Sequence, residues 1–163
     1  MINTTKPSIN IHPSVYGALE KIAAKQNIDV NEVIQRALID FTWNERALDE
    51  EAYKELKMSR ELIDQAVQVA QEICERDGFR SDITYEAIKV CKEDPEWIEK
   101  YRVIVGDDIY RNGNPRKGPI NRQIGLRIRR ATGAQPRLGS NGKPENVKVS
   151  GDIIQTYTPL VRN

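Results

Sequence analysis

Residues 7–42 read PSINIHPSVYGALEKIAAKQNIDVNEVIQRALIDFT, and their pattern predicts the fold of the N-terminal part of the chain. Polar and apolar residues alternate from Ser8 to His12, which is the period of a half-buried strand. Pro13 ends the alternation, because proline has no N–H to donate to a neighbouring strand. The sequence therefore predicts a short strand over Ser8–His12.

Two helical patterns follow this predicted strand. Apolar residues recur at spacings of three and four in the first of them, at Val15, Leu19, Ile22 and Ala23. Asn27-Ile28 interrupts the pattern. Asp29 and Glu32 then have the spacing of a capping box, which marks the start of a helix. We expect this second helix over Asp29–Phe41, with an apolar face made by Val33, Ile34, Ala37, Leu38 and Phe41.

A strand and two helices of this length are too small to fold alone. They could fold as a two-fold dimer, in which two copies pair their strands antiparallel and interlock their helices. In order and spacing, residues 7–43 resemble the ribbon–helix–helix family of DNA-binding proteins, which includes the methionine and Arc repressors. The resemblance rests on the alternating strand, on Pro13, on the turn through Ile28 and on the capped helix from Asp29.

The resemblance implies that a two-stranded ribbon enters the major groove of double-stranded DNA. Its outer face would contact bases through Ser8, Asn10 and His12. Phosphates would be held by Lys6 and by the amides of Val30 and Asn31 at a helix start. The dimer core would contain Ile9, Ile11, Leu19, Ile34, Leu38 and Phe41. A dimerisation module without DNA contact is the alternative that these residues leave open.

The whole chain has 163 residues, of which 39% are hydrophobic and 30% charged, enough for one domain or two small ones. It has no apolar run of membrane-spanning length, and its N-terminus lacks the apolar core of a signal peptide. Cys74 and Cys91 lack metal-ligand spacing, which favours a reducing cytoplasm. No cofactor or metal motif and no nucleophile–base set is evident, and His12 is the single histidine, so we do not expect an enzyme.

Charge is distributed unevenly along the chain. Residues 1–43 hold four basic and four acidic side chains, residues 44–110 hold ten basic and eighteen acidic ones, and residues 111–163 hold eleven basic and two acidic ones. Such asymmetry indicates a nucleic-acid partner for the basic third. We expect phosphate contacts from Arg116, Lys117, Arg122, Arg127, Arg129 and Arg130. The alternative is that this basic surface docks on the acidic middle segment of the same or a partner chain.

Beyond the first module, the sequence predicts a mainly α fold with short β elements. Residues 45–77 would form one long helix, or two helices joined near Met58-Ser59. This segment, 45–78, would act as a linker between domains or pack on its neighbours as an amphipathic helix. Residues 79–163 would form an α+β domain with helices over 83–93 and from Pro95, a turn-rich loop over 107–119 and a basic helix led by Pro119. A basic hairpin around the turn at 139–142 would complete the order of a winged helix.

These features together predict a cytoplasmic homodimer that binds double-stranded DNA and acts as a transcriptional regulator, a repressor by occupancy. Two other interpretations stay open. In one, the chain is an antitoxin whose C-terminal part grips a partner protein. In the other, it is an accessory DNA-binding protein of plasmid partition or of a relaxosome.

Overall fold

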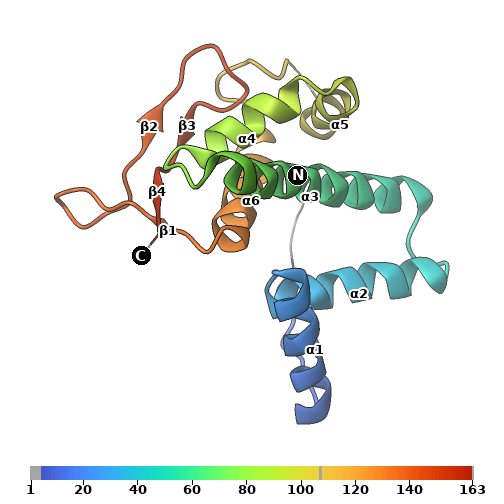
Figure 1. The fold of residues 1–163 in the computed structure, drawn as a ribbon. Coiled ribbons are helices and arrows are strands. Elements are labelled where there is room, and N and C mark those ends of the chain that lie inside the picture. The colour runs from blue at the N-terminus through green and yellow to red at the C-terminus, as the bar shows by residue number, and fades with distance from the viewer. Residues whose placement is uncertain (1–4, 107, 163) are drawn as a thin grey trace. The chain divides into compact units, whose positions relative to one another are not determined.

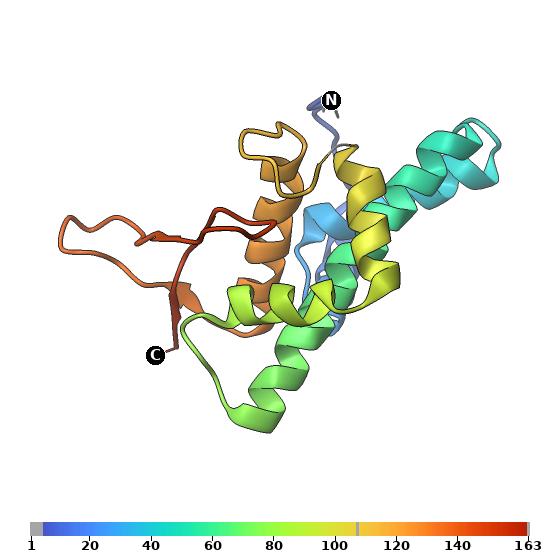
Figure 2. The ribbon, with the colours of Figure 1, turned by 90° about the horizontal axis from the view of Figure 1, so that it is seen from above.

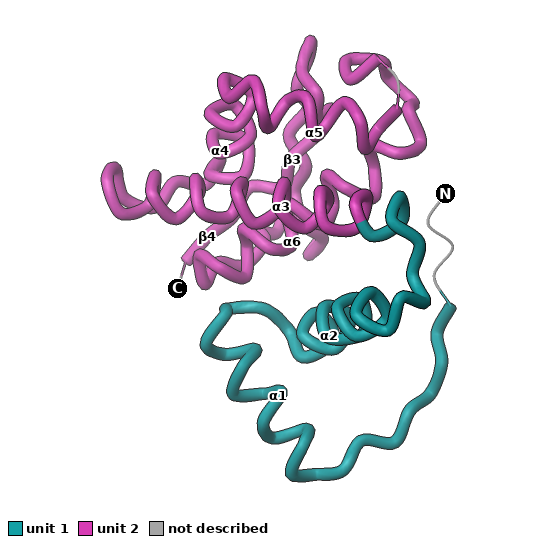
Figure 3. Tube along the Cα trace, turned by 90° about the vertical axis from the view of Figure 1, so that its right-hand side faces the viewer, with its two compact units in different colours: residues 1–53 teal, residues 54–163 magenta. Residues whose placement is uncertain are grey.

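The computed structural model describes residues 5–106 and 108–162, so Asp107, the first residue of the predicted loop, lies outside the described residues. The described residues form six helices and four very short strands (Figure 1). The chain divides into two compact units, Met1–Tyr53 and Lys54–Asn163 (Figure 3). We describe each unit by itself.

The first unit contains the two predicted helices, α1 (Pro13–Gln26) and α2 (Val30–Asn44). His12 caps α1, because its Nδ1 accepts a hydrogen bond from the Ser14 amide at 3.3 Å. Asn27 takes the left-handed conformation that ends the helix. The predicted cap of α2 is present: an Asp29 carboxylate oxygen accepts from the Glu32 amide at 2.9 Å. Local capping chemistry thus fixes both helix boundaries at the turn.

The predicted strand over Ser8–His12 is wrong, and with it the ribbon–helix–helix fold expected for the N-terminal module. Residues 5–12 form neither helix nor strand, and α1 begins at Pro13. The alternation of side chains is real, but a strand is held by backbone hydrogen bonds to a neighbour. Within the described part of the first unit no second extended segment supplies them. His12, expected on the strand, is instead used as a helix cap.

The second unit is built on α3 (Glu50–Asp77), a single continuous helix that starts four residues before the boundary between the units. Its buried face carries Leu62, Ala66, Ala70 and Ile73. The helices α4 (Ile83–Lys92) and α5 (Pro95–Val105) follow, and α4 packs against both α5 and α6 (Lys117–Ala131), as Figure 2 also shows. The fully buried Trp97 of α5 donates from its indole Nε1 to the Leu62 carbonyl at 3.0 Å, which ties α5 to α3.

The C-terminal segment folds back beside these helices. It forms two antiparallel pairs, β1 (Gln135–Pro136) with β4 (Leu160–Val161), and β2 (Val147–Lys148) with β3 (Thr156–Tyr157). The Leu160 amide donates to the Ser81 carbonyl at 2.8 Å, and Arg162 Nε donates to the Thr132 carbonyl at 2.7 Å. These bonds anchor the end of the chain to the turns that follow α3 and α6.

The predicted winged-helix arrangement is therefore also wrong. The turn at 139–142 is present, but its arms share an isolated bridge, Leu138 with Pro144, instead of a hairpin ladder. Pro136 and Pro144 have no N–H groups, which limits pairing across this turn. The alternating Val147-Lys148 pairs with residues further along the chain instead, across the turn at Gly151, whose φ is +69°. The result is mainly helical, with two very small sheets.

In the described part of the chain, no helix combines the length and the apolar character needed to cross a membrane.

Candidate nucleic-acid interface

A cleft of about 600 Å³ opens in the second unit along one face of α6. This helix contributes Lys117, Gly118, Asn121, Arg122, Gly125, Leu126 and Arg129, which recur at helical spacing. Thr84 and Ile88 of α4 also line the cleft. The C-terminal segment adds further residues, namely Pro136, Pro144, Asn146, Leu160 and residues 153–158. The packing of the chain's end beside α6 thus creates the cleft.

Three cations of α6 line this cleft: Lys117, Arg122 and Arg129. Among the described residues, none that lines the cleft is acidic, and none of these three cations is paired with a carboxylate. Steps of five and seven residues place them along the helix axis at intervals of about 7.5 Å and about 10.5 Å. The cleft therefore has a row of positive charges along one wall.

Lys117 is the most deeply placed of the three, with 4% of its surface exposed. Its Nζ donates to the backbone carbonyl of Arg111 at 3.2 Å. Burial lowers the pKa of this ammonium from its ordinary value, while the negative charges of Asp108 and Asp152 oppose the shift. A buried ammonium with a carbonyl acceptor and no ion-pair partner gains from an anion that supplies the missing charge.

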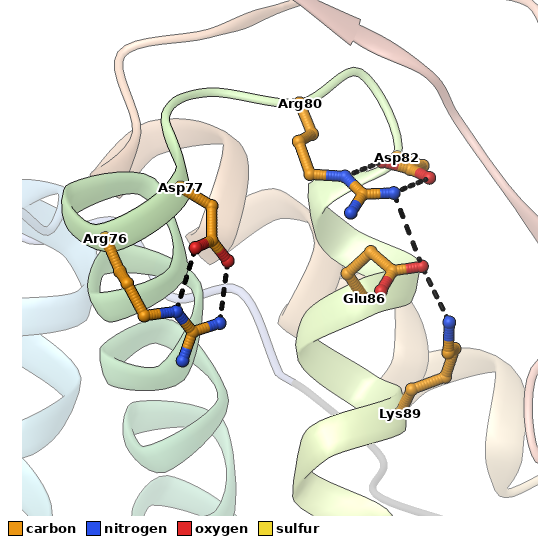
Figure 4. A network of polar contacts seen from close by, with 6 residues as sticks. All are labelled: Arg76, Asp77, Arg80, Asp82, Glu86 and Lys89. Atoms are coloured by element: carbon orange, nitrogen blue, oxygen red, sulfur yellow. Dashed lines mark hydrogen bonds and ion pairs between the residues drawn. The ribbon is translucent and has the colours of Figure 1, made fainter.

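Several cations elsewhere in the second unit have carboxylate partners, although Lys143 and Lys148 of the C-terminal segment have none within the part of the chain that the structure describes. Figure 4 shows Arg80 forked on Asp82, with N–O distances of 2.9 and 3.0 Å, and Glu86 lying between Arg80 and Lys89. Lys92 contacts the buried Asp152 at 2.7 Å. Arg127 of α6 is paired as well, with Asp64. The three cleft cations have no such partner among the described residues.

The structure sorts the predicted phosphate contacts of the basic third into two groups. Lys117, Arg122 and Arg129 lie in the cleft. The others do not: Arg127 pairs with Asp64 of α3 at 3.0 Å, Arg130 is exposed outside the cleft, and Arg116 lies over the backbone of Gly106. Docking of basic residues on the acidic middle segment, the alternative interpretation, thus holds for Arg127.

The base contacts predicted in the first unit, Ser8, Asn10 and His12, are exposed residues of the irregular segment before α1, as is Lys6. Val30 and Asn31 do occupy the first turn of α2, but the side chain of Asp29 already accepts from an amide there. The base and phosphate contacts expected of the first unit stay predictions.

Most of the residues predicted for the dimer core do not belong to the buried core of the first unit. The buried residues there are Ala23, Ile28 and Val33, with Leu19 and Val30 packed on them. Ile11 and Ile34 are half-buried, whereas Ile9, Leu38 and Phe41 are exposed. The first unit thus has an unusually small core together with exposed apolar side chains.

Several cleft residues escaped the sequence analysis. The polar side chains of Asn146, Gln155, Thr156 and Thr158 come from a segment whose position beside α6 depends on contacts distant in sequence. Gly118 and Gly125, by contrast, could have been recognised in the sequence by their spacing. They lie two helical turns apart, on the face that also carries Arg122 and Arg129, and glycine inside a helix is costly unless its missing side chain has a use.

Comparisons with protein-family models, with curated proteins and with solved structures gave no significant match.

Proposed function

We propose that the protein binds nucleic acid through the α6 cleft and acts as a homodimeric DNA-binding regulator. The observation that carries this proposal is the row of Lys117, Arg122 and Arg129 in a cleft whose described lining holds no carboxylate. A cation without an ionic partner inside a protein cleft attracts an anion, and a row of cations fits an anion with repeated charges. Phosphodiester backbones have this character.

Arginine makes the cleft better suited to phosphate than to a simple counter-ion. The guanidinium group is planar and can donate two parallel hydrogen bonds to two phosphate oxygens. Within the described chain, the guanidinium groups of Arg122 and Arg129 make no hydrogen bond to another side chain, so their donors are available. The amide and hydroxyl groups of the C-terminal segment provide the polar surroundings that nucleic-acid contacts require.

The homodimer is supported by the first unit. Val15, Tyr16 and Ile22 of α1 and Leu38 and Phe41 of α2 are exposed, and the core of this unit contains three buried residues among those that the structure describes. A unit with so little buried apolar surface gains stability by covering those side chains. Residues 1–43 hold equal numbers of acidic and basic groups, so a second copy meets no net repulsion. Two copies would place two clefts on one DNA molecule, which favours regulation by occupancy.

The cytoplasm is the compartment we propose, because Cys74 and Cys91 are both free thiols and Cys91 is buried in the core.

The test is the binding of full-length protein to a labelled DNA duplex of random sequence across a salt series. Arg129→Gln should weaken binding and reduce the slope of log affinity against log salt by about one unit. Arg130→Gln is the matched control, since it removes the same charge from the adjacent position outside the cleft. An equal loss in both variants would overturn the role of the cleft. The proposed function would be overturned if neither this duplex nor a single strand of the same sequence bound at any salt concentration.

A further inference from the structure

We infer that the cleft holds one single strand of nucleic acid, laid lengthwise along α6 between Lys117 and Arg129. This inference rests on the proposed function and names the form of nucleic acid that the cleft accepts. Four features of the second unit support it: the size of the cleft, the spacing of its cations, the bare backbone of α6 beneath them and the groups of the opposite wall.

The size of the cleft excludes a duplex from its interior. A volume of about 600 Å³ is that of a small-ligand site. Duplex DNA has a major groove that alone is about 12 Å wide, so a duplex can touch the mouth of this cleft but cannot enter it. A single strand is thin enough to lie within it, with its bases free to turn towards either wall.

The charges of the cleft are spread along it. Lys117 and Arg129 are separated by twelve residues, which is about 18 Å along a helix axis. An isolated phosphate can contact only one end of such a row. A strand that carries one negative charge per nucleotide can contact all three cations at once, so the row fits a polyanion better than a monoanion.

Two glycines make the α6 wall bare between these cations. A Cβ added at Gly118 would meet no atom within 4 Å, and one added at Gly125 would meet only Cγ2 of Thr84, at 3.9 Å. Neither glycine has a positive φ. Neither packing nor backbone conformation therefore requires glycine at position 125, where it costs about 1 kcal/mol of helix stability relative to alanine. A ligand that approaches the helix backbone closely would explain it.

The opposite wall offers groups that suit bases. Tyr157 lines the cleft and stacks on Tyr85, with ring centroids 5.4 Å apart, which holds its ring in a fixed orientation. Asn146 and Gln155 contribute exposed amide groups. Aromatic rings stack on bases without regard to sequence, and amides bond their exposed edges. The phosphates would then face α6 and the bases the C-terminal segment.

The experiment is a competition assay with full-length protein and a fluorescent short oligothymidylate, read by anisotropy. The competitors are unlabelled oligothymidylate, oligouridylate, a blunt duplex of the same length and inorganic phosphate. We expect either single strand to compete at least about tenfold better than the duplex or inorganic phosphate. The better of the two single strands identifies DNA or RNA as the source of the strand.

The decisive variant is Gly125→Leu, which fills the bare wall without changing the charge. It should lower the affinity for the single strand by about tenfold or more, and it should leave the midpoint of urea unfolding unchanged or raised, because leucine favours a helix. Gln123→Leu adds the same side chain to an exposed position of α6 outside the cleft and should leave binding unchanged.

The outcomes separate this inference from the proposed function. If the duplex competes as well as the single strand, or if Gly125→Leu binds normally, the inference is overturned and nucleic-acid binding stands. If inorganic phosphate competes as well as the strand, the cleft is a site for an isolated phosphate and the inference fails. If neither strand nor duplex binds, the inference and the proposed function both fail.

Discussion

The two units of this chain differ in how they are held together. Among the described residues, the core of the second unit contains twenty buried apolar side chains, whereas that of the first contains three. Both units expose large apolar side chains, such as Phe41 and Leu38 in the first and Val103 and Leu126 in the second, so the difference lies in the core. Burial of apolar surface must offset the entropy of ordering the chain. We therefore expect the second unit to be stable by itself and the first to depend on association.

The chain provides one tryptophan in each unit to test this difference. Trp97 is fully buried in the second unit, and Trp43 stacks on Tyr53 in the first, with ring centroids 4.1 Å apart. Replacing either tryptophan by phenylalanine leaves the fluorescence of the other as the reporter of its own unit. Unfolding of the two units can then be followed separately in urea.

The largest effect is expected from Leu62→Ala in the second unit. Leu62 has no exposed surface, and its backbone carbonyl, which accepts from Trp97, would remain. Removing a fully buried leucine side chain costs about 2–5 kcal/mol of unfolding free energy. The Trp97 transition should move to lower urea, and the Trp43 transition should stay. If both transitions moved together, the units would fold as one, which would contradict the expectation that the second unit is stable by itself.

The second largest effect concerns the ion pair between Lys92 of α4 and the buried Asp152, which ties the C-terminal segment to α4. Asp152 accepts from Lys92 Nζ at 2.7 Å and from the Ile153 amide at 2.7 Å, and the Tyr85 hydroxyl lies 3.4 Å away. Asp152→Ala should cost about 3 kcal/mol, the lower end for a broken buried pair, because the 22% exposure of Lys92 lets water reach it. The urea unfolding transition reported by Trp97 fluorescence measures this loss of unfolding free energy.

Asp152→Asn is the companion variant, because it keeps a side-chain oxygen for the Ile153 amide and removes the charge alone. It should lose less than Asp152→Ala. Equal losses would show that the charge, rather than the hydrogen bonds, holds this end of the chain.

Local chemistry made the helices predictable from the sequence. The Asp29 cap, the spacing of Val33 and Ile34 and the left-handed Asn27 act within a few residues of one another, so the pattern is sufficient to place α2. The strand over Ser8–His12 failed for the opposite reason. Its alternation describes which side chains share a face, whereas a strand exists only where another segment bonds to its backbone.

The candidate site was predictable only in part. Its basic residues stand out as a run in the sequence, but their roles depend on the direction in which each leaves the helix. Arg127 and Arg129 are two residues apart and therefore point to different sides of α6, one to Asp64 and the other into the cleft. The second wall of the cleft comes from residues 136–160, whose place is set by long-range bonds such as Arg162 to Thr132. Sequence periodicity carries no information about such bonds.

A third, smaller effect is expected from Phe41→Asp in the first unit. The ring is 61% exposed in the single chain, so the change has little effect on the fold of one copy. If the apolar face binds a second copy, a charge there should weaken association by about 2 kcal/mol, or roughly thirtyfold. Sedimentation velocity across a concentration series measures this.

Tyr110→Asp is the control for Phe41→Asp, because Tyr110 is an exposed aromatic residue of the second unit. It should leave association unchanged. A wild-type chain that is monomeric at every concentration would contradict the homodimer, and a different protein that co-purifies on this face would replace the second copy as its partner.

The smallest effect is expected from Arg80→Gln, although Figure 4 shows Arg80 bonded to both carboxylate oxygens of Asp82. The pair is exposed, and exposed pairs contribute little because water and salt screen them. The hydrogen bond from Arg80 lowers the pKa of the Asp82 carboxyl below its ordinary value of 3.8. The stabilisation by this pair is therefore present at neutral pH and is lost as the pH falls through and below that value.

The melting temperature of Arg80→Gln should accordingly lie slightly below that of the wild type at neutral pH and low salt. The difference should vanish in strong acid and shrink in high salt. A difference as large as that of Asp152→Ala would mean that the region around Arg80 is shielded from water in solution.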